Sequence, residues 1–262
     1  MLTLEYLLEE AKNNGLPVQK RRGVLREYLQ VIILNSIYKH NFGKLLFFMG
    51  GTALRFFYNM PRFSEDLDFD AAGLNIRQFK EILANVQSGL QKEGFSTTVS
   101  VEKRNNLFIA ELYFKELMKL YEITDKRGLD MMIKIEVYKP RWKIHSESLV
   151  LSLYGYNFSA VLLSKENIIS EKVLALLNRK RGRDIYDLLF MLRKKFPFNE
   201  HILKANKVKL PVKETVLNHL KSLTKKELKF LADQVRPFLF KEEEAELILK
   251  APLFAEHLLK DY

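Results

Sequence analysis

The sequence predicts an α+β fold in which interleaved strands and helices are followed by a helical C-terminal part. Before about residue 165, helical periodicity alternates with short apolar or alternating segments, which are typical of strands. Beyond that point, five helix-length segments follow one another, punctuated by Gly182 and by prolines. We therefore expect two domains, an α/β domain with N-terminal helices at residues 1–164 and a helical domain at residues 165–262.

Each expected element has its own local signal. Apolar residues at helical spacing predict an amphipathic helix over 19–40, and the charge-free run at 45–49 before a glycine pair predicts a buried strand. Further N-terminal segments are a short helix at 52–58, a strand at 67–69, a helix at 76–90, a hairpin of 97–102 and 107–113, a strand at 131–137, and two strands within 148–163. The C-terminal helices are expected at 168–179, 184–194, 215–223, 225–238 and 242–249.

The composition narrows the class of protein. A net charge of +11 favours a polyanionic partner, either nucleic acid or nucleotide phosphates, although a solvated lysine-rich surface is the alternative. The absence of cysteine excludes a disulfide scaffold, thiolate catalysis and cysteine-ligated metal sites. The charged first residues are unlike a secretory signal and the longest uncharged stretch is short for a membrane span, so we expect a cytoplasmic location without membrane contact.

The C-terminal third is the most basic part of the chain. Its lysines lie at positions 204, 207, 209, 213, 221, 225, 226 and 229, and a compact group of cations at 179–183 precedes them. This distribution is compatible with RNA binding.

The segment around a glycine pair carries the clearest chemistry. Gly50 and Gly51 end a strand, so the chain can turn tightly there, and the next helix presents N–H groups to phosphate, with the Thr52 hydroxyl in reach. Asp66 and Asp68 lie two apart on a strand, so their carboxylates share a face, and Mg²⁺ commonly binds one or two carboxylates plus substrate phosphates. Singly, each motif has an ordinary structural explanation, but their order favours a metal–nucleotide site.

A third acid lies on a later predicted strand. Glu136 and Lys134 share one face of the strand at 131–137, while their neighbours are apolar. This strand could bring an acid and a cation to the same cleft, but an exposed strand face explains the pair equally well.

Two charged motifs follow in the helical part. Lys172 and Arg179 lie along one helix face with the small Ala175 between them, which suits a triphosphate or an ordinary basic surface. Asp184 and Asp187 are candidate catalytic acids, but an N-cap followed by an acid is also a common helix start.

These motifs together resemble a known family. Gly-Gly-Thr, then Asp-x-Asp, then an isolated acid is similar to the nucleotidyltransferase superfamily that includes polymerase β and the tRNA CCA-adding enzymes. The string GGTALRFFYNMPRFSEDLDF at 50–69 resembles the AbiEii-type toxins of type IV toxin–antitoxin and phage-abortive systems. Residues 172–179 match the family pattern K-x-x-A-x-x-x-R, and residues 184–187 match D-x-x-D.

The resemblance implies a nucleotidyltransferase-type mixed sheet with flanking helices. It also implies transfer of a nucleoside monophosphate from an NTP to RNA, with tRNA as the expected acceptor and Mg²⁺ or Mn²⁺ as the cofactor. The expected metal ligands are Asp66, Asp68 and Glu136, which are also catalytic together with Asp184 and Asp187. The expected nucleotide contacts are Gly50, Gly51, Thr52, Arg62, Ser64, Lys134, Lys172 and Arg179.

In such systems the antitoxin is typically a separate DNA-binding protein that need not touch the toxin. Two alternatives to the RNA-modifying enzyme remain. One is a catalytically silent RNA-binding module of the same fold, and the other is a nucleotidyltransferase that acts on a small molecule or a protein.

Overall fold

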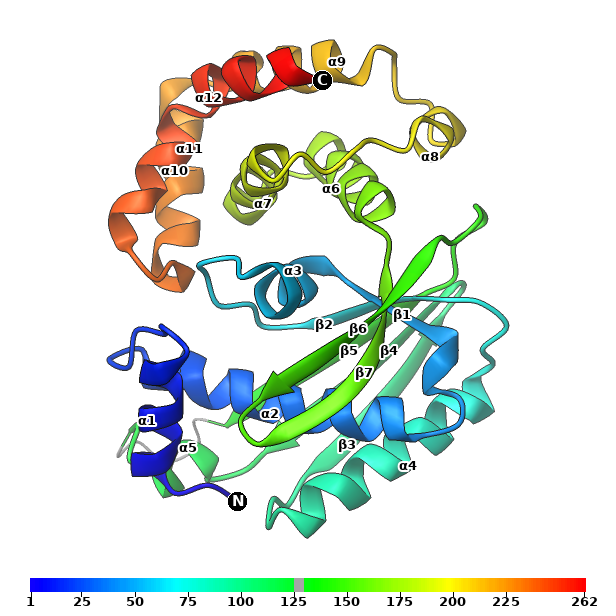
Figure 1. Cartoon of the computed structure of the whole chain (residues 1–262), viewed down its shortest axis with the longest axis vertical. Coiled ribbons are helices and arrows are strands. Elements are labelled where there is room, and N and C mark those ends of the chain that lie inside the picture. Colours follow the sequence, from blue (N-terminus) through cyan, green and yellow to red (C-terminus); the bar gives the residue numbers. More distant parts are fainter. Residues whose placement is uncertain (125–129) are drawn as a thin grey trace. The chain divides into compact units, whose positions relative to one another are not determined.

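The chain forms two compact units in the computed structural model, which describes residues 1–124 and 130–262 without the side chain of Asp261. The first unit comprises Met1–Tyr58, Phe63–Arg141 and Ser146–Leu162, and the second comprises Asn59–Arg62, Trp142–His145 and Leu163–Tyr262. Figure 1 traces the chain through both units. Two four-residue segments therefore leave the first unit and join the second. The domains expected at 1–164 and 165–262 remain a proposal.

The first unit is built on a mixed sheet of seven strands in the order β3-β4-β5-β2-β1-β7-β6. The strands are β1 Leu46–Met49, β2 Leu67–Ala71, β3 Thr98–Arg104, β4 Leu107–Phe114, β5 Met131–Tyr138, β6 Ser146–Leu153 and β7 Tyr156–Leu163. At the centre, β2 pairs in antiparallel fashion with β1 and in parallel fashion with β5. The expected strands are thus confirmed, and each extends beyond its predicted bounds or matches them within a few residues.

The two faces of the central strands differ in chemistry. Leu67 and Phe69 of β2 are buried and lie beside Ile135 and Val137 of β5, which are also buried, so these four side chains form one apolar face. Asp68 and its neighbours in the register point to the opposite face, because successive side chains alternate along a strand.

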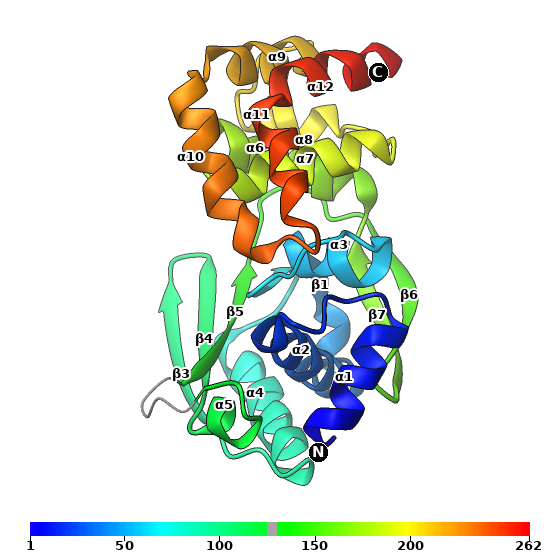
Figure 2. The same ribbon diagram turned by 90° about the vertical axis from the view of Figure 1, so that its left-hand side faces the viewer.

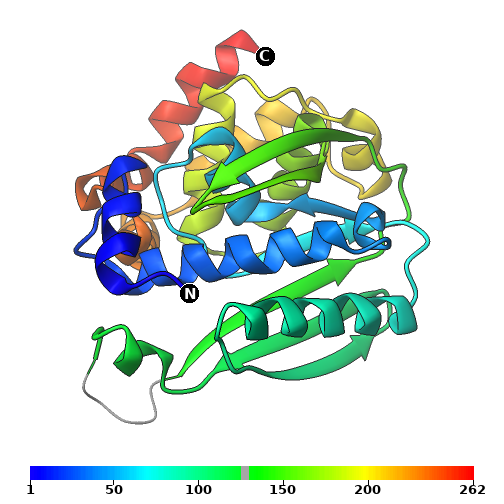
Figure 3. The same cartoon turned by 60° about the horizontal axis from the view of Figure 1, so that its bottom comes forward.

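Helices cover the apolar face. The helices of this unit are α1 Leu4–Asn13, α2 Arg21–Lys39, α3 Gly50–Tyr58, α4 Ile76–Lys92 and α5 Leu117–Leu120, with a 3₁₀ turn at Gly43–Leu45. Helices α2 and α4 pack against each other and run side by side along the sheet (Figure 3). Phe79 of α4 stacks on Phe108 of β4, which places α4 on the apolar side.

The helix expected at 19–40 is confirmed as α2, but its polar side does not face water. Almost every residue from Val24 to Ile37 is buried, including Arg26, Glu27 and Gln30. An amphipathic surface helix would expose such residues. Buried polar groups of this kind require partners inside the protein, because an unpaired one destabilises the fold.

The second unit is helical around α7. Its elements are α6 Lys165–Asn178, α7 Gly182–Arg193, α8 Glu200–Ala205, α9 Val212–Ser222, α10 Lys225–Val235, α11 Glu246–Leu249 and α12 Ala251–Leu258, with 3₁₀ turns at Arg236–Phe238, Glu242–Ala245 and Leu259–Asp261. Helix α7 contacts α6, α10, α11 and α12, and most of its residues are buried (Figure 2). A Cβ at Gly182 would collide with the backbone carbonyl of Leu231, so the start of α7 packs directly on α10.

Some short helices escaped prediction. Helices α1, α5, α8 and α12 have no counterpart among the expected helix ranges. Helices α5 and α8 span only four and six residues, and segments this short carry little periodicity. Pro252, one of the prolines expected to separate helices, instead lies in the first turn of α12, where proline is well tolerated. Within residues 1–124 and 130–262, none of the helices has the length and apolar character that a membrane crossing needs.

Candidate functional site

The glycine turn and the aspartate strand are in direct contact in the first unit. Gly50 begins α3 with φ +75°, in the left-handed region that side chains rarely adopt. A Cβ at this position would collide with the carboxylate of Asp68, whose Cα lies opposite Met49 in the β1–β2 ladder. Glycine at position 50 therefore satisfies both the turn and the close approach of a carboxylate.

The three acids expected as metal ligands come together on one side of the sheet. Asp68 lies opposite Glu136 in the parallel β2–β5 register, although 68 residues separate them in the sequence. Asp66 directly precedes β2 and lies two residues from Asp68, so the two carboxylates share a face. All three are partly exposed, whereas Leu67 and Phe69, the two neighbours of Asp68 in the sequence, are buried.

Lys134 lies among these acids. Its ammonium is 3.0 Å from Glu136 Oε1 and 4.0 Å from Asp66 Oδ2. Burial alone would lower the pKa of Lys134, but the hydrogen bond to Glu136 and the charge of Asp66 outweigh it and raise that pKa. Lys134 therefore stays protonated and offsets part of the negative charge.

Two of the three acids are suited to bind a divalent cation. Carboxylate oxygens suit Mg²⁺ and Mn²⁺, and Mg²⁺ is commonly held by one or two carboxylates plus substrate phosphates. No group of three or more His, Asp or Glu side chains within the described residues is arranged to hold a metal ion. Asp66 and Asp68 fit such a pair, and Glu136 fits less well because Lys134 binds its carboxylate.

The Thr52 hydroxyl, an expected phosphate contact, makes a hydrogen bond within the protein. Thr52 is buried, and its Oγ1 donates to the backbone carbonyl of Asp66 at 2.5 Å. This bond joins the first turn of α3 to the residue that opens the acid motif. Ser64, another expected nucleotide contact, is partly exposed and accepts at its carbonyl from Gln30 Nε2 at 3.2 Å.

The remaining predicted residues form a separate network in the second unit. Arg62 donates to both carboxylate oxygens of Asp187, each at 2.7 Å, and the two side chains are 2% and 0% exposed. Lys172 bridges the two acids, with its ammonium 3.0 Å from Asp187 and 3.1 Å from Asp184. Arg179 binds Asp184 through two nitrogens, at 2.8 and 3.1 Å. The two helical motifs thus bind each other.

The two acids of this network and Lys172 are held in their charged forms. Burial would raise the pKa of Asp187, but Arg62 and Lys172 lower it to about 2. Burial also opposes ionisation of Asp184, yet Lys172 and Arg179 hold its pKa below the usual range. Lys172 is similarly stabilised as a cation, because Asp187 and Asp184 raise its pKa against the effect of burial. Buried carboxylates in this state are poor proton carriers at neutral pH.

The structure contradicts the capping role suggested for Asp184 and leaves its catalytic role a prediction. It is the third residue of α7, whose N-cap is Arg181 with no side-chain cap, so Asp184 is not a capping residue. Nor does its carboxylate stand open to a substrate, since it is buried and accepts from Lys172 and Arg179. In this structure Asp184 pairs with Lys172 and Arg179, and Asp187 pairs with Lys172 and Arg62, whereas a catalytic role for either acid stays a prediction.

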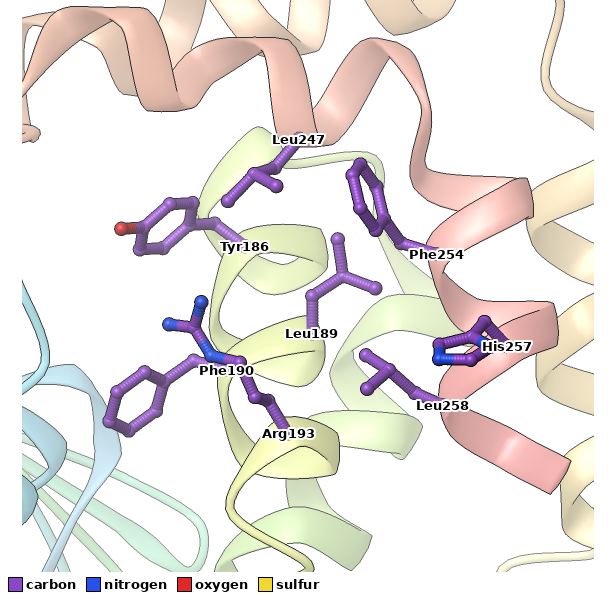
Figure 4. A pocket seen from close by; sticks show the side chains of 8 residues that line it. All are labelled: Tyr186, Leu189, Phe190, Arg193, Leu247, Phe254, His257 and Leu258. Atoms are coloured by element: carbon purple, nitrogen blue, oxygen red, sulfur yellow. The ribbon is translucent and has the colours of Figure 1, made fainter. Parts of the chain in front are cut away.

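The opposite side of α7 borders an apolar pocket. Figure 4 shows Tyr186 and Leu189 of α7 facing Leu247 and Phe254 across a cavity of about 110 Å³, with Arg193 also among its lining residues. The Tyr186 hydroxyl donates to the carboxylate of Glu244. This lining suits apolar groups rather than a triphosphate, so the pocket is distinct from the acid site.

The eight lysines singled out in the C-terminal third are all exposed. Lys204 pairs with Glu200 and Lys221 pairs with Glu256, each at 3.1 Å. RNA binding by this surface stays a prediction.

The sequence pattern did not single out the buried polar residues of α2. Gln30 and Arg26 contact the segment just before Asp66, and Glu27 pairs with Arg55 of α3. Their spacing of three and four residues within an otherwise apolar helix is the signal that could have found them.

Comparison with known proteins gives one family. Residues 32–257 match the family described as nucleotidyl transferase AbiEii toxin, type IV TA system. Two solved structures from Helicobacter pylori share the fold. JHP933 has a TM-score of 0.55 and 19% identity, covering 92% of this chain and 94% of that one. A second, described as a candidate nucleotidyltransferase, has the same TM-score and identity, covering 92% and 98%. Among curated proteins, no match was found.

Proposed function

The chain belongs to the AbiEii family of nucleotidyltransferase toxins of type IV toxin–antitoxin systems, and on that premise we propose that it transfers a nucleoside monophosphate from an NTP to RNA. In this reaction a hydroxyl of the acceptor attacks the α-phosphorus of the NTP, the α–β phosphoanhydride bond breaks, and pyrophosphate leaves. The acceptor that we propose is tRNA, following the family resemblance. The observation that carries the proposal is the contact of Gly50 with Asp68 beside Glu136.

The acid face supports a division of labour between its residues. Asp66 and Asp68 would hold Mg²⁺, or Mn²⁺ in its place, and the metal would neutralise charge on the NTP phosphates when bound. The turn at Gly50 and Gly51 brings the N-terminus of α3 next to Asp68, and free N–H groups there suit phosphate oxygens. Lys134 would keep the Glu136 carboxylate oriented through their hydrogen bond.

The charged network of the second unit supports positioning rather than proton transfer. Asp187 holds Arg62 through two hydrogen bonds within the second unit. Asp184 and Asp187 also orient Lys172. Lys172, Arg179 and Arg62 each bind an aspartate in this structure. A contact between one of these cations and the triphosphate would therefore require the substrate to replace that aspartate.

The wider setting follows from the same proposal. The exposed lysines of the second unit would bind the RNA backbone through its phosphates. The protein would act in the cytoplasm as the toxin of a toxin–antitoxin pair that serves in phage defence. Its antitoxin would be a separate DNA-binding protein without direct contact.

Incubation with labelled nucleotides tests the function. The purified chain would be mixed with total RNA and each α-³²P-labelled NTP in Mg²⁺, with a chelator in a parallel sample. We expect label in the tRNA band from at least one NTP, and none with chelator or with the Asp68→Asn protein. Asp233→Asn is the matched control, since Asp233 is an exposed acid of α10. Label in a protein or a small molecule instead would overturn the RNA acceptor, and no label with any NTP would overturn the proposal.

A further inference from the structure

We propose that one buried polar face of α2 positions the acid-bearing segment for nucleotidyl transfer. The face consists of the buried polar residues Arg26, Glu27 and Gln30 together with the partly exposed Gly23, and we call it the α2 docking face. Its residues are positioning residues, since they contact the segment at 63–65 and helix α3 rather than the acids themselves. This inference rests on the proposed function, because it assigns the face to the reaction at Asp66 and Asp68.

The four residues share one side of the helix. Positions 23, 26, 27 and 30 follow the i, i+3, i+4, i+7 spacing that lines up side chains along one helix face. Glu27 and Gln30 are 2% and 1% exposed. Burying such groups opposes folding unless each finds a polar partner. The hydrogen-bond partners of these residues therefore indicate the function of the docking face.

Gln30 binds the backbone directly before the acid motif. Its Nε2 donates to the carbonyl of Ser64 at 3.2 Å and to the carbonyl of Glu65 at 3.1 Å. Two successive carbonyls held by one amide leave little freedom for the chain that enters Asp66. Arg26 adds a side-chain contact to the same segment, because its Nη1 lies 2.7 Å from Glu65 Oε1.

Gly23 allows a further contact with the same segment, because it has no side chain. A Cβ there would come within 2.7 Å of the ring of Phe63, so the ring lies directly on the backbone of α2. Phe63 is itself buried. The segment from 63 to 65 is thus held by three residues of the docking face in succession.

Glu27 holds helix α3, which carries the glycine turn of the site. Its carboxylate receives two hydrogen bonds from Arg55 of α3, at 3.0 and 3.2 Å, and both side chains are buried. Helix α3 begins at Gly50, the residue that contacts Asp68. One face of α2 therefore holds both α3 and the segment before the acids.

Helix α3 and the acid-bearing segment must stay close together for the site to function. Gly50 contacts Asp68, and Thr52 Oγ1 donates to the Asp66 carbonyl, so a small shift of either the helix or the segment opens the site. A misplacement of about 1 Å can lower a reaction rate by roughly 100-fold. The family match starts at residue 32, after the docking face, so the inference comes from the contacts of this chain alone.

Paired amide replacements on α2 test the inference. Gln30→Met removes the two hydrogen bonds to 64 and 65 while keeping the side-chain size. Asn35→Leu is the matched control, because Asn35 is a buried amide of the same helix with no described contact to residues 63–66. The measurements are kcat and KM for the NTP, the melting temperature, and hydrogen–deuterium exchange of peptides covering 63–68.

We expect Gln30→Met to lower kcat roughly 10- to 100-fold with KM changed less than about twofold. Exchange should become faster at 63–68, while Asn35→Leu should retain both kcat and the exchange pattern. Unchanged kcat and exchange in Gln30→Met would overturn the inference, and so would an equal loss of kcat in the Asn35→Leu control.

A double-mutant cycle covers the case in which Gln30→Met fails to fold. If Arg26 acts through Glu65, then Arg26→Met and Glu65→Gln should each slow kcat, and the double variant should be no slower than the worse single one. Additive losses would contradict this. If the wild-type protein transfers no nucleotide, the proposed function fails, and exchange at 63–68 alone decides whether the docking face holds the segment.

Discussion

At the scale of single residues, Gly50 combines two separate reasons that disfavour a side chain. Its positive φ alone disfavours other residues, and its contact with Asp68 adds a steric limit. Gly73 has a similar φ of +70° but nothing within 4 Å of an added Cβ. The two glycines therefore separate the effect of backbone strain from that of the collision.

We expect Gly50→Ala to abolish nucleotidyl transfer and to lower the free energy of unfolding by more than Gly73→Ala. The left-handed conformation costs an alanine roughly 1–2 kcal/mol, and both variants carry this cost. Only Gly50→Ala adds the collision with Asp68. Urea unfolding and a turnover assay check the pair, and equal stability losses with retained turnover in both variants would refute the expectation.

At the scale of elements, charged residues link α6 to α7. Lys172 of α6 lies between Asp184 and Asp187 of α7, and Arg62 closes the network on Asp187. Removing one partner of a buried ion pair destabilises a protein by about 3–5 kcal/mol, because the other charge is left uncompensated. The two aspartates differ in this respect, since Arg179 is 46% exposed whereas Arg62 is 2% exposed.

We expect Asp187→Asn to destabilise the protein by about 3–5 kcal/mol, because it leaves buried Arg62 without its carboxylate. Asp184→Asn should cost less, since Arg179 can turn into water. The unfolding midpoint in urea checks both. Similar losses of stability for the two variants would indicate that the exposure of the paired arginine does not determine the size of the effect.

The low pKa of Asp187 predicts acid sensitivity. Its folded-state pKa of about 2 lies below the ordinary value of 3.8. The unfolded chain therefore takes up the proton first as the pH falls, so the stabilisation is fully present above pH 4 and is lost between about pH 4 and pH 2. The difference in unfolding free energy between wild type and Asp187→Asn should shrink by on the order of 2 kcal/mol over this window. A constant difference from pH 7 to pH 2.5 would contradict the low pKa.

At the scale of the whole molecule, positive charge is the property that bears on the acceptor. The chain carries a net charge of +11, and the lysines of α10 are exposed. Phosphate contacts release counterions, so such binding weakens as salt rises.

We expect the triple change of Lys225, Lys226 and Lys229 to Ala to weaken tRNA binding and leave KM for the NTP unchanged. Each lost phosphate contact should reduce the slope of log affinity against log salt by about 0.7–0.9. Alanine at Lys12 and Lys80, two exposed lysines of the first unit, is the control. Fluorescence anisotropy at several salt concentrations measures the slope, and the same slope in both proteins would show that α10 is only a solvated surface.

The sequence by itself determined the order of the strands and of most of the longer helices, and the identity of the acid motif. The alternation of Leu67, Asp68 and Phe69 specifies a strand with one apolar face, and the glycine pair before Thr52 specifies a turn into a helix. These features depend on neighbours a few residues apart, so periodicity and motif spacing suffice to predict them. The family resemblance, and with it the fold class, rests on the same local strings.

Only the tertiary structure decided which charges meet. Glu136 lies beside Asp68 because of a strand register, and Asp187 binds Arg62 across 125 positions of the sequence. The polar side of α2 carries the same lesson, since its periodicity favoured a face in water whereas Gln30 binds a loop. Hydrogen bonds and ion pairs join residues that are far apart along the chain, and local spacing carries no information about such partners.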